Sequence, residues 1–211
     1  MLRTVADWMG RLYPSKAWGQ IDDVVALESG IDSDDVLALA EELATELRGA
    51  AFVREGSESD LCDYIYVLCQ GREPCALQVH YDGAVLPGEW DDSEMLEEFY
   101  LRVAISSVAP LAVVQQVAVS LSMVDGRWMV SEKLAAGVYD APLLKRFQRL
   151  VALLPTYGLT HLDMGEISEP LKGFDDSDYR DLFDRPAHQV NYLFFREPST
   201  MQSVALLNAR D

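Results

Sequence analysis

The sequence predicts an α+β fold: an antiparallel sheet built on two hairpins and packed by helices, with extra N-terminal helices and a C-terminal β-rich extension. Two segments carry alternating apolar residues on both sides of a turn sequence, which is typical of hairpins. Several others repeat apolar residues every three or four positions, which is typical of helices with one buried face. We expect one domain over residues 1–211, made of N-terminal helices (1–33), a helix and sheet core (34–154) and the extension (155–211).

One hairpin is predicted at the end of an uncharged run from Val103 to Val124, which is long enough to span a bilayer. Pro110 and two adjacent glutamines interrupt the run, and its second half alternates as a strand does. Asp125-Gly126 follows, and this dipeptide favours a tight hairpin turn. We therefore assign the run to a protein core and not to a membrane. The predicted register pairs Met123 with Trp128 and Leu121 with Val130.

The other hairpin is predicted between Asp63 and Gly83, with its loop at Gly71–Pro74. In this register Tyr66 faces Val79, and the aromatic residues of both strands fall on one side of the sheet. A short strand at residues 50–55 precedes it.

Helices are predicted where the apolar spacing changes to three and four residues. The segment 91–104 begins with candidate caps and acidic residues, which favour a helix N-terminus. In that helix Glu98 and Arg102 form an exposed pair four residues apart. The remaining predicted helices cover residues 4–13, 21–30, 33–49 and 140–155.

The predicted order over residues 34–154 is helix, three strands, helix, two strands, helix. This order resembles the class I type III secretion chaperones and the related YbjN-like proteins. The resemblance implies a protein that binds extended segments of other proteins and catalyses no reaction.

The cysteines and histidines do not predict a metal site. Cys62, Cys69 and Cys75 contain no Cys-x-x-Cys spacing, and odd separations along a strand point side chains to opposite faces. The loop at 175–184 starts like a calcium-binding EF-hand but lacks its glycine and its final glutamate. We therefore expect no metal and no cofactor.

The sequence also lacks the local motifs of common enzymes, namely a nucleophile elbow, a His-Glu-x-x-His pair and a glycine-rich phosphate loop. We predict no catalytic residues and a protein that is not an enzyme. A cysteine paired with a histidine in space stays open, because such sites assemble only in the fold.

The formal net charge of −18 predicts the kind of partner. Such a surface repels nucleic acids and anionic lipids and attracts a basic protein; the alternative is that the charge serves solubility alone. The N-terminus carries acidic Asp7 and no apolar run typical of a signal peptide, so we expect a cytoplasmic protein with reduced cysteines.

These expectations favour a bacterial immunity protein, an acidic binder that neutralises a cognate toxin by direct contact. The alternative is a secretion-chaperone-like protein holding an effector, and a small-ligand-binding or enzymatic domain is a third reading. The candidate contact residues are carboxylates: Asp35, Glu42 and Glu46 on the helix at 33–49; Asp91, Asp92, Glu94 and Glu97 at the start of the helix at 91–104; and Asp175, Asp176, Asp178 and Asp181 in the acidic loop.

Overall fold

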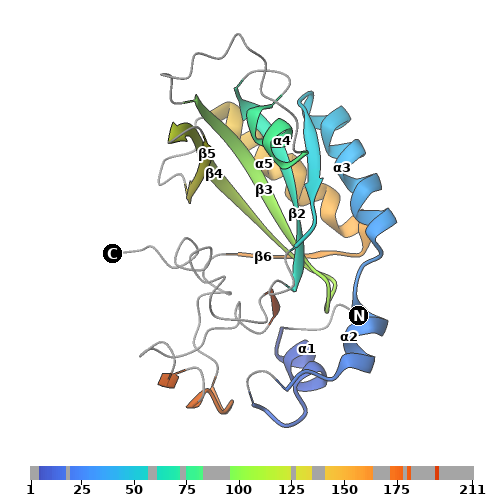
Figure 1. Ribbon diagram of the computed structural model, residues 1–211. Helices are drawn as coiled ribbons and strands as arrows, with labels where there is room; N and C mark the ends of the chain where they lie inside the picture. Colours follow the sequence, from blue (N-terminus) through green and yellow to red (C-terminus); the bar gives the residue numbers. More distant parts are fainter. Residues whose placement is uncertain are drawn as a thin grey trace.

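The computed structural model describes residues 5–17, 20–56, 61–71, 75–82, 96–124, 127–134, 141–163, 172–177, 180–181 and 193–194. Its helices are α1 (Val5–Leu12), α2 (Asp23–Ser29), α3 (Ser33–Leu47), α4 (Ala76–Tyr81), α5 (Ala141–Leu153) and the 3-10 helix η1 (Leu154–Tyr157). Its strands are β1 (Ala51–Arg54), β2 (Cys62–Gln70), β3 (Leu96–Ser106), β4 (Leu111–Val124), β5 (Arg127–Leu134) and β6 (Thr160–Leu162). The fold is α+β, as predicted (Figure 1).

The sheet is an antiparallel meander in the order β1-β2-β3-β4-β5 (Figure 1). Strand β4 is long enough, at 14 residues, to have two partners on one edge. Its first residues pair in parallel with β6, and its later residues pair with β5 from Val117 onward. The two strands at the centre of the sheet, β3 and β4, are therefore bonded on both edges over much of their length.

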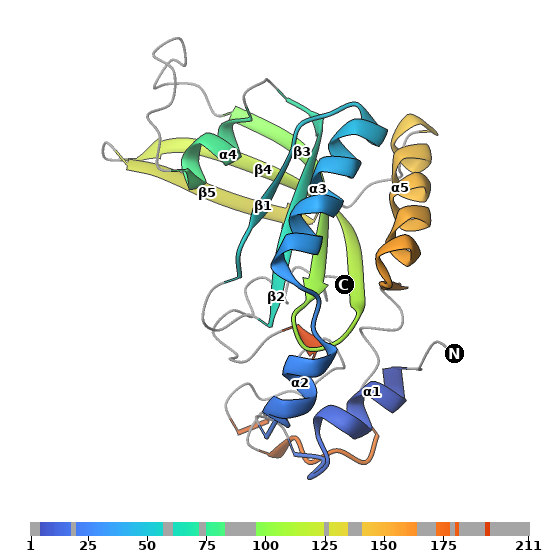
Figure 2. The same cartoon turned by 90° about the vertical axis from the view of Figure 1, so that its right-hand side faces the viewer.

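Helices α3 and α5 cover one face of the sheet, and α4 lies on the other (Figure 2). The alternation of β2 explains this division, because successive side chains of a strand point to opposite faces. Ile65 and Val67 pack with α3 and α5, whereas Tyr64 and Tyr66 pack on the face that carries α4. Both faces are buried along the middle of the strand, which gives the sheet two separate hydrophobic cores.

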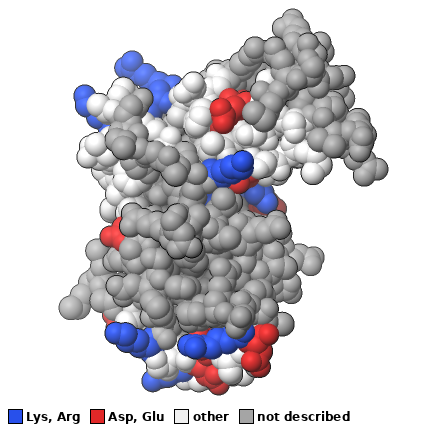
Figure 3. Space-filling view, turned by 90° about the vertical axis from the view of Figure 1, so that its left-hand side faces the viewer, with Lys and Arg blue, Asp and Glu red and all other residues white. Residues whose placement is uncertain are grey.

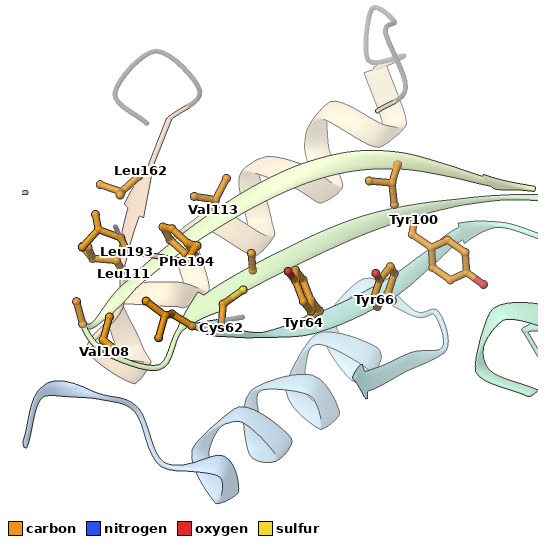
Figure 4. Packing of buried hydrophobic residues seen from close by; sticks show 14 of the residues in the cluster. Cys62, Tyr64, Tyr66, Tyr100, Val108, Leu111, Val113, Leu162, Leu193 and Phe194 are labelled. Carbon is orange, nitrogen blue, oxygen red and sulfur yellow. The ribbon is translucent and has the colours of Figure 1, made fainter. Parts of the chain in front are cut away.

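Two residues of the C-terminal extension contribute to the hydrophobic core on the face of the sheet that carries α4. Leu193 and Phe194 are buried and lie beside Leu111 and Leu162 (Figure 4). The backbone N–H of Leu61 donates to the Phe194 carbonyl at 2.8 Å. The predicted extension thus packs, at least through these two residues, against the same sheet as the rest of the chain.

Several sequence predictions are confirmed. The β4–β5 hairpin has the predicted register, with Met123 opposite Trp128 and Leu121 opposite Val130. Helices α1, α2, α3 and α5 lie within the predicted segments, and β1 forms the predicted short strand. In α3 the apolar residues spaced three and four positions apart form the buried face, as this spacing predicts: Val36, Leu39, Ala40, Leu43 and Leu47.

The other predicted hairpin is wrong in its second strand, because Ala76–Tyr81 is helix α4. Tyr66 does not pair with Val79; it pairs with Phe52 of β1 and Arg102 of β3. Once β1 and β3 occupy both edges of β2, no edge remains for a third strand.

The predicted helix over 91–104 is also wrong where the structure describes it, because β3 begins at Leu96. The side chains from Tyr100 to Ser106 are buried in succession, which places them between the two cores. A strand buried on both faces has no polar alternation to distinguish it from a buried helix. Glu98 and Arg102 are consequently buried instead of forming an exposed helical pair.

The observed order from α3 to α5 is helix, two strands, short helix, three strands, helix. It differs from the predicted order at α4 and β3, and the resemblance to secretion chaperones stays a prediction. In the tail, β6 confirms part of the predicted strand content. Leu193 and Phe194 also belong to the extension that is predicted to be rich in strands, but neither residue is in a strand.

Candidate functional site

The most acidic described part of the chain is the helical pair α2 and α3. From Gln20 to Leu47 the sequence has nine Asp or Glu residues and no Lys or Arg. Figures 1 and 2 agree that α2 lies beneath the start of α3 on the outside of the molecule. We call the exposed side chains here the α2–α3 surface: Asp23, Val24, Leu27, Glu28, Asp32, Asp34, Asp35, Leu37 and Glu41.

Three large apolar side chains on the α2–α3 surface are exposed among these acids. Leu27 is 85% exposed, Val24 is 65% exposed and Leu37 is 51% exposed. Single exposed apolar residues are ordinary on protein surfaces. Three of them on two adjacent helices, with charged neighbours, have the composition of an interface that has apolar anchors and a polar rim.

Side-chain caps fix both helices of this surface. The Asp22 carboxylate accepts the N–H groups of Val24 and Val25 at 3.1 Å, and Asp32 accepts the N–H of Asp34 at 3.0 Å. A carboxylate at a helix N-terminus bonds unpaired donors and interacts favourably with the helix dipole. The carboxylates of Asp22 and Asp32 are therefore stabilised by the helices that they cap.

The predicted stripe on α3 is only partly open to solvent. Asp35 is exposed, but Glu42 accepts the hydroxyl of Tyr157, and Glu46 forms an ion pair with Arg149. Arg149 comes from α5, which packs beside α3, and Tyr157 comes from η1. Glu42 and Glu46 therefore join helices of the same molecule, and the sequence prediction that they form one open stripe with Asp35 overlooked these partners.

The other candidate contact residues do not gather at one place that the structure describes. Glu97 is exposed on β3, and Asp181 is exposed. In the acidic loop Asp175 accepts the amide and hydroxyl of Ser177, and Asp176 accepts Arg180 Nε at 2.7 Å. Four predicted contact residues lie outside the described residues: Asp91, Asp92, Glu94 and Asp178.

A second concentration of polar groups lies on the α4 face of the sheet and centres on Glu132. Arg102 Nη1 donates to the Glu132 carboxylate at 2.9 Å, and the hydroxyl of Tyr66 donates to it at 3.0 Å. The hydroxyl of Tyr81, at the end of α4, donates at 3.2 Å. Arg54 lies 3.8 Å away from the same carboxylate. We call these five side chains the Glu132 cluster.

Burial changes the acid–base chemistry of the tyrosines in the Glu132 cluster. Burial, reinforced by the negative charge of Glu132, raises the pKa of Tyr66 to about 12. The same two causes raise the pKa of Tyr81 above its usual value. Both phenols therefore stay protonated at neutral pH and act as donors to the carboxylate.

A second buried carboxylate, Glu98, holds the other end of α4. It accepts the backbone N–H groups of Ala76 and Leu77 at 2.9 and 3.1 Å and the hydroxyl of Tyr100. Burial, followed by this hydrogen bond, raises the pKa of Tyr100. With Glu98 at its N-terminus and Tyr81 bound to Glu132 at its C-terminus, α4 is fastened to the sheet at both ends.

Sequence reasoning missed the Glu132 cluster, although one signal was present. Arg102 stands directly before the uncharged run from Val103 to Val124, and a charge in such a place requires a partner. The partners come from β1, β2, β3, β5 and α4, which are distant in sequence. Only the fold brings them together.

Among the described residues, no group of three or more His, Cys, Asp or Glu side chains is arranged to hold a metal ion. Cys62 and Cys75 are buried, and Cys69 is half-buried. In the same part of the chain, no helix has the length and apolar character needed to cross a membrane.

Comparison of the chain with protein-family models, with curated proteins and with solved structures finds no match.

Proposed function

We propose that the chain is a non-enzymatic binding protein that captures a basic partner protein through the α2–α3 surface, in the manner of a bacterial immunity protein that neutralises a toxin. The observation that carries the proposal is the uninterrupted acidity of residues 20–47 together with the exposed apolar side chains of Val24, Leu27 and Leu37. The acids attract a cationic partner over a distance, and the apolar side chains bury surface on contact.

The charge supports a basic protein as the occupant more strongly than any other class. A net charge of −18 repels nucleic acid and anionic lipid, so neither fits this surface. Attraction between opposite charges raises the association rate more than it raises the affinity. A neutraliser that must act before a toxin reaches its target benefits from this rate.

The experiment uses the product of the gene adjacent to this one as the candidate partner. The variant D34K/D35K/E41K reverses three exposed acids on α3, and E55K/D82K/D163K reverses three exposed acids elsewhere. Both variants change the net charge equally. We expect the α3 variant to associate at least about tenfold more slowly at low salt and to lose most of its salt dependence. Equal slowing by both variants would show that only net charge matters and would overturn the assignment of this surface.

Stoichiometry tests the non-enzymatic part of the proposal. A binder protects a target of the toxin only when the two proteins are present in about equal amounts, whereas an enzyme acts at far lower amounts. We therefore expect protection to reach its limit at one binder for each toxin molecule. Full protection at a small fraction of that ratio would contradict the proposal.

The alternative function, a secretion chaperone, predicts a different occupant. Such a protein holds an extended segment, whereas capped helices present a fixed shape that suits a folded partner. The two functions are separated by testing the partner before and after unfolding. Binding only to the folded partner supports the immunity function, and binding only to the unfolded chain supports the chaperone.

A further inference from the structure

The Glu132 cluster contains two guanidinium groups and one carboxylate. Arg54 and Arg102 both pair with Glu132, at 3.8 and 2.9 Å. Both guanidinium groups also lie over the ring of Tyr64, at 5.4 and 5.5 Å from its centre. Among these described side chains, two positive charges thus share one negative charge in a partly buried place, so the cluster carries a net positive charge.

The guanidinium N–H groups of Arg102 and Arg54 differ in how many of them donate hydrogen bonds. Arg102 gives Nη1 to Glu132 and Nη2 to Gln115, while its buried Nε has no hydrogen-bond partner. Arg54 gives Nη1 to Tyr66 at 3.5 Å, and within the part of the chain that the structure describes its Nε and Nη2 donate to no group. The Nε–Nη2 edge of a guanidinium is one of the edges that can bind a carboxylate with two parallel hydrogen bonds.

Arg54 is also held in place before any ligand arrives. Its guanidinium lies 4.8 Å from the ring centre of Tyr81 as well as over Tyr64. The side chain of Arg54 is 32% exposed and the residue Tyr81 is 38% exposed, so solvent reaches both. Figure 3 shows the side of the molecule to the left in Figure 1, where positive and negative side chains meet midway down the described surface. Fixing a long side chain in advance lowers the entropy that binding costs.

From this arrangement we propose that the Arg54–Tyr81 edge of the Glu132 cluster binds a planar monocarboxylate, with Arg54 Nε and Nη2 on its two oxygens and the tyrosine rings beside its body. A dianionic phosphate suits the place less well, because Glu132 lies close by and the whole protein repels a second negative charge. The site lies on the α4 face of the sheet and is separate from the α2–α3 surface, so either can fail without the other.

The test follows the Nε–H signal of Arg54 by NMR while sodium benzoate is added to the full chain. We expect a saturable shift with a dissociation constant on the order of 1 mM, the scale of one bidentate charge-assisted pair supported by ring contacts. Variants at Arg54 lack this signal, so binding by the variants and by the native chain is compared through the ring protons of Tyr81. R54Q should weaken binding at least about tenfold, and K145Q, which makes the same change in charge on the exposed part of α5, should leave it unchanged. No saturable shift of the Arg54 signal, or equal loss in K145Q, would overturn the site.

Two further arms examine the geometry and the source of the carboxylate. R54K keeps the charge but lacks the planar guanidinium, so we expect its affinity for benzoate also to fall about tenfold. Binding as tight as in the native chain would mean simple charge attraction and would overturn the bidentate mode.

A capped peptide with one central glutamate tests a side-chain carboxylate against free benzoate. Competition between the two at Arg54 supports the site with a protein ligand, and binding of benzoate alone supports it with a small acid. Phosphate binding as tight as benzoate would overturn the preference for a monocarboxylate.

Discussion

Arg102 of β3 and Glu132 of β5 form an ion pair 2.9 Å long across the intervening strand β4. Gln115 of β4 accepts the second amine of Arg102 at 2.7 Å, so three strands are joined by side chains as well as by backbone. The side chain of Arg102 is only 4% exposed. A buried charge of this kind is stable only while its partner is present.

We therefore predict that E132Q lowers the free energy of unfolding by about 3 kcal/mol, because it leaves Arg102 buried without a counter-charge. The double variant R102M/E132L should lose less than E132Q, because an apolar pair of similar size removes the uncompensated charge. Denaturant unfolding of the single and double variants measures both values. A loss in R102M/E132L equal to the sum of the losses in R102M alone and E132L alone would show that the residues are not coupled.

Glu98 gives a second prediction, which concerns α4 alone. E98Q weakens two hydrogen bonds to the backbone N–H groups of Ala76 and Leu77, and we expect a loss of about 2 kcal/mol. Hydrogen exchange at these two amides should accelerate more than exchange in β3. E97Q, at the exposed neighbouring position, is the control and should change neither quantity. Unchanged exchange in E98Q would mean that side-chain packing alone holds the helix.

Two glycines make a matched pair for testing backbone packing. A Cβ at Gly30 would lie 2.2 Å from the Ser107 carbonyl oxygen, whereas a Cβ at Gly10, inside α1, would meet nothing within 4 Å. G30A should therefore lower stability by about 2 kcal/mol or more, because backbone must move. G10A should raise stability by about 0.5–1 kcal/mol, since alanine loses less entropy in a helix. Thermal unfolding of both variants checks the opposite signs.

The raised pKa of Tyr66 predicts a loss of stability in alkali. Its folded pKa of about 12 lies above the usual value of 10.0, so between these values the unfolded chain releases a proton that the folded chain keeps. The stabilising contribution is complete below pH 10 and falls by about 2 kcal/mol by pH 12. Denaturant unfolding at several pH values should show this decline, with a shallower slope in Y66F. A slope in Y66F equal to that of the native chain would assign the decline to the other tyrosines.

Much of the architecture follows from local sequence signals. Asp125-Gly126 and the alternation on either side set the β4–β5 register, because a one-residue slip would turn the apolar face outward. The apolar spacing of α3 predicted its buried side, since most of its exposed residues are polar. The acidity of residues 20–47, which carries the proposed function, is likewise a property of the sequence.

The sequence by itself determined the α+β class, the helices with one polar face and the hairpin with a specific turn, because each depends on residues close together in the chain. The tertiary structure decided where the local signals were ambiguous. Residues 96–106 form a strand that pairs with β2 and β4 and is buried on both faces from Tyr100 onward. Residues 76–81 form a helix whose first N–H groups bond Glu98, which lies 22 residues after Ala76. It also decided that Glu42 and Glu46 have partners and that Arg54, Arg102 and Glu132 meet, since no local pattern records which distant side chain will neutralise a charge.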